Sequence, residues 1–72
     1  MKLLIYSTNI NTPEKVQVVN EIFHMDNNII DLSVDIEDID NVLRIETTDK
    51  IDEVEVVSRV LKQGFNCVEL VD

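Results

Sequence analysis

The segment Thr8–Val16, with the sequence TNINTPEKV, does most to constrain the fold of this chain. Apolar residues alternate with a period of two up to this segment, a pattern typical of a β-strand over about residues 2–8. Within the segment, Thr12 is a good helix N-cap, and Pro13 fits the first helical position, where no amide hydrogen is needed. An apolar stripe at helical spacing then follows, made of Val16, Val19, Ile22 and Phe23. The segment therefore predicts a strand that is followed closely by a helix.

The middle of the chain has the pattern of a β-hairpin. Residues 30–36 alternate between apolar and polar or acidic side chains, and residues 42–47 have the composition of a return strand. Between them, residues 38–41 have the sequence DIDN, which favours a turn. We therefore expect two antiparallel strands in this region.

A second helix is predicted to begin at Asp52. Asp52 and Glu55 have the spacing of a capping box. The predicted inward stripe of this helix is Val54, Val57, Val60 and Leu61. Gly64, the only glycine, stands where helices commonly end in a left-handed residue. Residues 66–71 are then expected to form the last strand.

These elements follow one another as strand, helix, strand, strand, helix and strand. This is the order of the α+β, ferredoxin-like βαββαβ fold, in which two helices cover one face of a four-stranded antiparallel sheet. Because the chain has 72 residues and no linker or repeat, we expect a single domain over residues 1–72.

The charge of the chain narrows the range of its partners. It has 15 acidic against 6 basic residues and a formal net charge of -9. An acidic surface repels phosphate groups, so we expect no nucleic-acid partner and no anionic membrane partner. The first residues, MKLLIY, are too short for the core of a signal peptide, and we expect a cytoplasmic protein.

Several residues also match a known family in the same order along nearly the whole chain. Ile10 stands where the family usually has a buried methionine, and Gly64-Phe65 matches the glycine-aromatic pair after its second helix. The first-helix stripe fits the family's core, and Val34-Asp35 and Val42-Leu43 fit its central hairpin. On these residues the chain resembles the heavy-metal-associated domain, the fold of copper chaperones and of the N-terminal modules of metal-transporting ATPases. The resemblance implies the same ferredoxin-like fold.

The metal-binding motif of that family is degenerate in this chain. The motif is Cys-x-x-Cys, and its two thiolates bind one soft metal ion beside the N-terminus of the first helix. The matching positions hold Thr12 and Lys15. A threonine hydroxyl is a poor ligand for a soft cation, and a lysine ammonium repels it. We therefore expect no bound metal ion and no cofactor.

Other candidate sites have a simpler structural interpretation. Thr12 and Lys15 could hold an anion at the helix N-terminus, but a cap and a solvated lysine explain them as well. Cys67, the only cysteine, is expected to be a small apolar filler of the last strand. His24 is expected to be a solvated surface residue. The segment 35–40 carries four acidic residues, Asp35, Glu37, Asp38 and Asp40, but it lacks the glycine and the ligand spacing of a calcium-binding loop.

No arrangement of catalytic residues can be argued from this sequence. Ser7, Ser33 and Ser58 are scattered, and the single histidine serves none of them. One glycine cannot make a phosphate-binding loop. We therefore expect a protein that is not an enzyme.

The face of the sheet away from the helices is a candidate interface. If Leu4, Tyr6, Thr8 and Ile10 point at the helices, as the resemblance implies, the residues between them point away. The predicted interface residues on this face are Leu3, Ile5, Val42, Cys67 and Val71. Contiguous exposed apolar side chains usually mark a partner site, whereas scattered ones are normal on any surface. A partner here would be another protein or a second copy of the chain.

Together these observations predict a small non-catalytic domain that acts as a protein-interaction or self-associating module. The alternative is a carrier or chaperone of copper or zinc that uses other ligands, for instance Cys67 with His24 or acidic groups. The two differ in whether the reduced protein binds copper(I) or zinc tightly.

Overall fold

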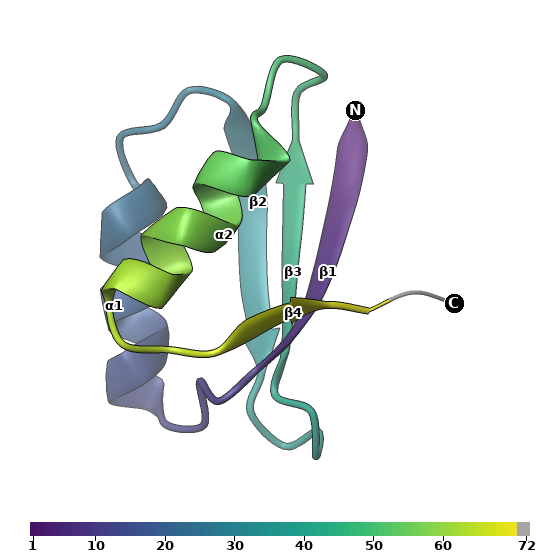
Figure 1. Cartoon of the computed structure of the whole chain (residues 1–72). Helices are drawn as coiled ribbons and strands as arrows, with labels where there is room; N and C mark the ends of the chain where they lie inside the picture. The colour runs from purple at the N-terminus through teal and green to yellow at the C-terminus, as the bar shows by residue number, and fades with distance from the viewer. Residues whose placement is uncertain (71–72) are drawn as a thin grey trace.

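The computed structural model describes residues 1–70, and it contains the predicted elements in the predicted order. The elements are β1 (Lys2–Thr8), α1 (Pro13–Phe23), β2 (Ile29–Asp35), β3 (Val42–Thr47), α2 (Glu53–Lys62) and β4 (Cys67–Glu69). The sheet has the order β2-β3-β1-β4, and all its strand pairs are antiparallel. Both helices lie on the same face of the sheet (Figure 1). The predicted α+β, ferredoxin-like fold is therefore confirmed.

The second helix begins and ends where local chemistry favours it. Asp52 Oδ1 accepts hydrogen bonds from the amides of Val54 and Glu55 at 3.0 and 3.3 Å. The carboxylate of Glu55 bonds to Arg59 at 2.7 Å, rather than closing the predicted capping box. After α2, Gly64 has a φ of 89°, a left-handed conformation that glycine adopts without strain. Among residues 1–70, no helix has the length and apolarity needed to span a membrane.

Two strands differ from their predicted bounds. β2 begins at Ile29, and a bulge between Ile29 and Asp31 shifts its register against β3. β4 comprises Cys67–Glu69, which is shorter than the predicted 66–71. Val71 lies outside the described residues.

The core lies between the sheet and the two helices. As predicted, Leu4, Tyr6 and Thr8 point from β1 into this layer, and they are 6%, 3% and 8% exposed. The alternate residues Leu3 and Ile5 therefore lie on the opposite face, which neither α1 nor α2 covers. The most enclosed apolar side chains of the core are Ile10, Val19, Leu43, Ile45, Val56 and Val60.

The predicted inward face of α2 is partly wrong. Val60 is buried as expected and Val57 is half-buried, but Val54 is 79% exposed and Leu61 is 50% exposed. Val56, which the prediction left out, is 1% exposed. Two neighbouring stripes of this helix are apolar, and the stripe that meets the sheet passes through Val56 and Val60, which are one helical turn apart.

Candidate functional site

The loop between β1 and α1 is held by hydrogen bonds to two other parts of the chain. Thr8 Oγ1 donates to the carbonyl oxygen of Asn41 at 2.6 Å and accepts from the amide of Ile10 at 3.1 Å. Asn9 Oδ1 accepts from the amide of Asn66 at 2.8 Å. Ile10 itself is fully buried. The loop is therefore fixed to the β2–β3 hairpin and to the segment that enters β4.

Thr12 and Lys15, the two positions that the resemblance aligns with Cys-x-x-Cys, take part in hydrogen bonds within this loop and the first turn of α1. Thr12 Oγ1 accepts from the amide of Lys15 at 3.2 Å, which confirms Thr12 as the N-cap. Lys15 Nζ donates to Asn11 Oδ1 at 2.9 Å. A capping hydroxyl and an ammonium group give these positions no ligand for a soft metal ion.

Cys67 lies on the helix side of the sheet, so its predicted place on the opposite face is wrong. It pairs with Thr8, and paired residues of antiparallel strands point to the same face. The side chain is 8% exposed and belongs to the core, as expected for an apolar filler. Burial raises the pKa of the Cys67 thiol to about 11. At neutral pH the thiol is protonated, which makes it a poor metal ligand.

His24 is exposed and caps the C-terminal end of α1. Cys67 is buried in the core, whereas His24 is exposed at the surface, so the two side chains do not present a common site. In the described part of the chain, no group of three or more His, Cys, Asp or Glu residues is placed to hold a metal ion.

The acidic hairpin turn uses its carboxylates to hold its own backbone. Asp35 Oδ1 accepts from the amides of Glu37 and Asp38 at 3.1 and 3.2 Å, and Asp38 Oδ1 accepts from the amide of Asp40 at 2.8 Å. All four residues are exposed, as expected for a solvated turn.

A comparison with solved structures finds the same fold in a chain described as "CsoZ metallochaperone". The TM-score is 0.77, and the match covers 93% of this chain and 96% of that chain at 16% sequence identity. The two chains share one fold. No known protein family and no curated protein matches the sequence. At this level of identity the likeness concerns the fold and does not extend to the binding of a metal.

The open face of the sheet carries an apolar patch along β1 and β4. Leu3 is 56% exposed and Ile5 is half-buried. The register of β4 against β1 places Val68 and Leu70 on the same face, where they are 64% and 39% exposed. We call Leu3, Ile5, Val68 and Leu70 the open-face patch.

The membership of this patch differs from the prediction. Leu3 and Ile5 lie on the open face, as predicted. Val42 alternates with the core residue Leu43 and so faces the open side, but it is only 6% exposed. Val68 and Leu70 take the place that was predicted for Cys67. In the register of β4 against β1, Cys67 pairs with Thr8 on the helix side and Val68 pairs with Ser7 on the open side.

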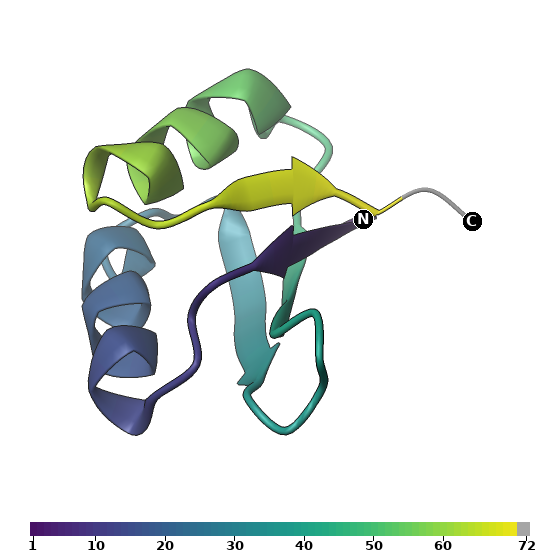
Figure 2. The same cartoon turned by 60° about the horizontal axis from the view of Figure 1, so that its bottom comes forward.

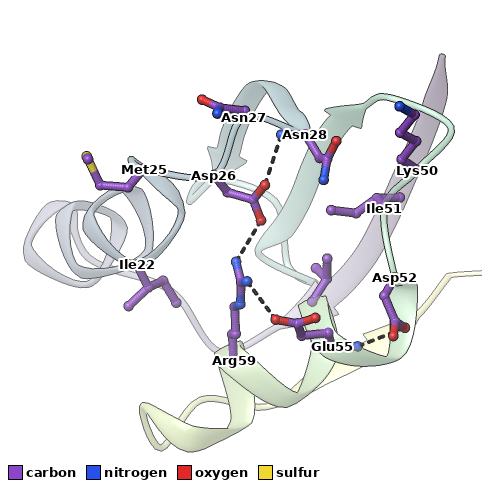
Figure 3. A pocket seen from close by; sticks show the side chains of 11 residues that line it. Ile22, Met25, Asp26, Asn27, Asn28, Lys50, Ile51, Asp52, Glu55 and Arg59 are labelled. Atoms are coloured by element: carbon purple, nitrogen blue, oxygen red, sulfur yellow. Dashed lines mark hydrogen bonds and ion pairs between the residues drawn. The ribbon is translucent and has the colours of Figure 1, made fainter.

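A polar pocket of about 550 Å³, which no sequence pattern predicted, lies between the end of α1 and α2 (Figure 3). Asp26 accepts hydrogen bonds from the amide of Asn28 at 2.9 Å and from Arg59 Nη1 at 2.8 Å. Arg59 Nη2 also donates to Glu55 at 2.7 Å, and the guanidinium lies 5.7 Å from the centre of the Phe23 ring. The hydrogen bond from Asn28, followed by the hydrogen bond and the positive charge of Arg59, holds the pKa of Asp26 below its usual range. These contacts link the end of α1 to α2. We call the ion pair of Asp26 and Arg59 the brace between α1 and α2.

No local sequence signal could have paired Asp26 with Arg59, because 33 positions separate them.

Proposed function

We propose that this chain is a small non-catalytic protein-interaction module, which has the fold of a metallochaperone but no thiolate metal site. The observation that carries the proposal is the engagement of Thr12 and Lys15 in hydrogen bonds of their own loop and helix. In this proposal the loop connects β1 to α1 and offers no pair of thiolates to a metal ion. A cytoplasmic location fits a chain whose single cysteine has no internal disulfide partner.

The open-face patch supports a binding role. Leu3, Ile5 and Val68 come from the neighbouring strands β1 and β4, and Leu70 directly follows β4, so that a partner could cover the four residues together. Contact with a different protein is favoured over self-association, because two copies that each carry a formal charge of -9 repel one another.

The proposal is tested first by titrating the reduced protein with copper(I) and with zinc against a competing chelator. We expect no binding tighter than about micromolar. Tight one-to-one binding would overturn the proposal.

Sedimentation velocity over a range of protein concentrations, with Leu3→Lys as the matched variant, tests whether the open-face patch mediates self-association. We expect both proteins to be monomers. In a separate binding assay, a partner protein should bind the parent and not Leu3→Lys. A partner that binds Leu3→Lys as tightly as the parent would remove the patch from the proposal.

A metal carrier with other ligands is the second candidate function. The likeness in fold to a metallochaperone favours it. Its ligands would have to come from carboxylates and His24, because Cys67 is buried and protonated. If the titration gives tight binding that His24→Ala abolishes, this candidate replaces the first.

A further inference from the structure

A groove of about 460 Å³ runs between α2 and the sheet at β4. The residues of α2 that line it include three apolar side chains, Val54, Val57 and Leu61, together with the polar Glu53 and Ser58. Val54 and Leu61 are 79% and 50% exposed, which makes them two of the larger apolar side chains that the fold leaves in water. This second apolar stripe of α2 is separate from the open-face patch, since the helices lie on the other side of the sheet (Figure 1).

The side chain of Tyr6 lines the groove from β1 and is only 3% exposed. Within residues 1–70 its hydroxyl makes no hydrogen bond with protein, yet it is not among the polar atoms fully shut off from solvent. A buried tyrosine usually places its hydroxyl against a partner. Burial, and then the nearby Cys67, Glu53 and Glu69, raise the pKa of Tyr6 to about 12, so the hydroxyl remains a donor. The groove therefore offers a hydrogen bond to an acceptor such as a peptide carbonyl.

Backbone groups at the edge of the sheet lie beside the groove. In the described chain β4 has only β1 as a neighbouring strand, and Figure 2 shows it between β1 and α2. The amide of Leu70 bonds to the carbonyl of Ile5 at 3.0 Å. Because bonded and non-bonded residues alternate in an antiparallel ladder, the backbone amide and carbonyl of Glu69 point away from β1. An open edge of this kind can pair with an added strand.

The charges around the groove select the sign of its ligand. Glu53 and Glu69 both line it, and among residues 1–70 no basic side chain does. The chain as a whole has a formal charge of -9. A second copy would bring like charge to these carboxylates, whereas lysine or arginine side chains would complement them.

We propose that the groove between α2 and β4 binds an extended, basic segment of a partner protein, which pairs with the edge of β4 and inserts an apolar side chain between Val54 and Leu61. Residues that alternate along a strand point to opposite faces, so one set enters the groove and its neighbours remain near the rim carboxylates. A backbone carbonyl of the segment accepts the hydrogen bond from Tyr6. This inference rests on the proposed function of the domain as a protein-interaction module, and it names a second surface and the chemistry of its partner.

The test uses a fluorescein-labelled peptide of alternating lysine and leucine, and its binding is followed by fluorescence anisotropy. Leu61→Ser should weaken binding by at least about tenfold, because it removes apolar contact from the groove. Ile39→Ser is the matched control: Ile39 is 94% exposed in the turn between β2 and β3 and is not among the residues that line the groove, so the affinity should stay unchanged. Both substitutions are at exposed positions, so both variants are expected to fold.

Two further peptides separate the parts of the proposal. A peptide of alternating lysine and serine keeps the charge and loses the apolar side chains, and it should bind at least about tenfold more weakly. A lysine-leucine peptide that is methylated at alternate backbone nitrogens cannot pair with β4, and it should also lose affinity. If either peptide binds as tightly as the parent peptide, the proposed mode of binding is wrong.

The location of the bound peptide distinguishes failure of this inference from failure of the proposed function. Amide chemical shifts of Val54, Val57 and Glu69 should move on binding. If Leu3→Ser weakens binding and Leu61→Ser does not, the peptide occupies the open-face patch, and the groove proposal fails while the interaction module stands. Tight metal binding in the chelator titration would instead overturn the proposed function, while unchanged peptide binding by Leu61→Ser is the result that overturns the groove proposal.

Discussion

Thr47 is the residue whose chemistry fits its surroundings least. Its side chain is fully buried on the helix side of β3, and within residues 1–70 its Oγ1 makes no hydrogen bond. A buried hydroxyl without a partner costs roughly 1–3 kcal/mol. The neighbouring Thr48 is different, because its Oγ1 donates to Asn28 Oδ1 at 2.8 Å. The two threonines therefore form a natural pair for comparison.

Replacement of Thr47 by valine should raise the free energy of unfolding by about 1 kcal/mol, because valine has nearly the same volume without an unpaired hydroxyl. Thr48→Val should lower it by about 1 kcal/mol, since it removes a satisfied hydrogen bond. Urea denaturation followed by circular dichroism measures both. If Thr47→Val were as destabilised as Thr48→Val, the Thr47 hydroxyl would have a partner after all.

At the scale of the element, the orientation of α2 makes a prediction that separates its two apolar stripes. Val56→Ala should lower the free energy of unfolding by about 2 kcal/mol, because it leaves a cavity in the core. Val54→Ala should change it by less than about 0.5 kcal/mol, since Val54 is largely exposed. Urea denaturation again provides the measurement. If Val54→Ala lowered the free energy of unfolding more than Val56→Ala, the predicted inward stripe through Val54 would be correct.

The brace between α1 and α2 should make stability depend on acid pH. The pKa of Asp26 is lowered in the folded state from an ordinary value of 3.8, so folding favours the carboxylate. Its contribution is therefore present above that ordinary value and is lost as the pH falls through the lowered pKa. At neutral pH, Asp26→Asn should reduce the free energy of unfolding by about 1 kcal/mol, because it removes the charge that pairs with Arg59.

The difference between Asp26→Asn and the parent should disappear in acid, where both side chains are neutral. Chemical denaturation at a series of pH values measures it. A difference that stays constant down to the lowest pH would mean that the volume or the hydrogen bonding of Asp26 matters, and its charge does not.

At the scale of the whole molecule, features encoded in neighbouring residues were predictable and features set by long-range contacts were not. The cap at Thr12, the left-handed Gly64 and the alternation of β2 depend on local chemistry, and they led to the correct order of elements. The side on which Cys67 points depends on the register of β4 against β1, which the short last strand does not reveal. The groove needs Tyr6 from β1 beside Leu61 from α2, and no local pattern brings those residues together.

The residues that hold the loop between β1 and α1 are different from Thr12 and Lys15, and this leads to a final prediction. Thr8, Asn9 and Ile10 hold the loop without help from Thr12 or Lys15. Thr12→Cys together with Lys15→Cys should therefore leave the loop in place and put two thiols across the first turn of α1. We expect this double variant to bind copper(I) at least about 100-fold more tightly than the parent, because two thiolates can hold one soft ion.

Each single variant should bind copper(I) almost as weakly as the parent, because one thiolate is not enough. The loss of the Thr12 cap should cost about 1 kcal/mol of stability, which the single variant Thr12→Cys measures separately. The chelator competition used for the parent provides the affinity. If the double variant binds no more tightly than the parent, the likeness to a metallochaperone is limited to the backbone fold. The loop would then not place two cysteines where both can bind one copper ion.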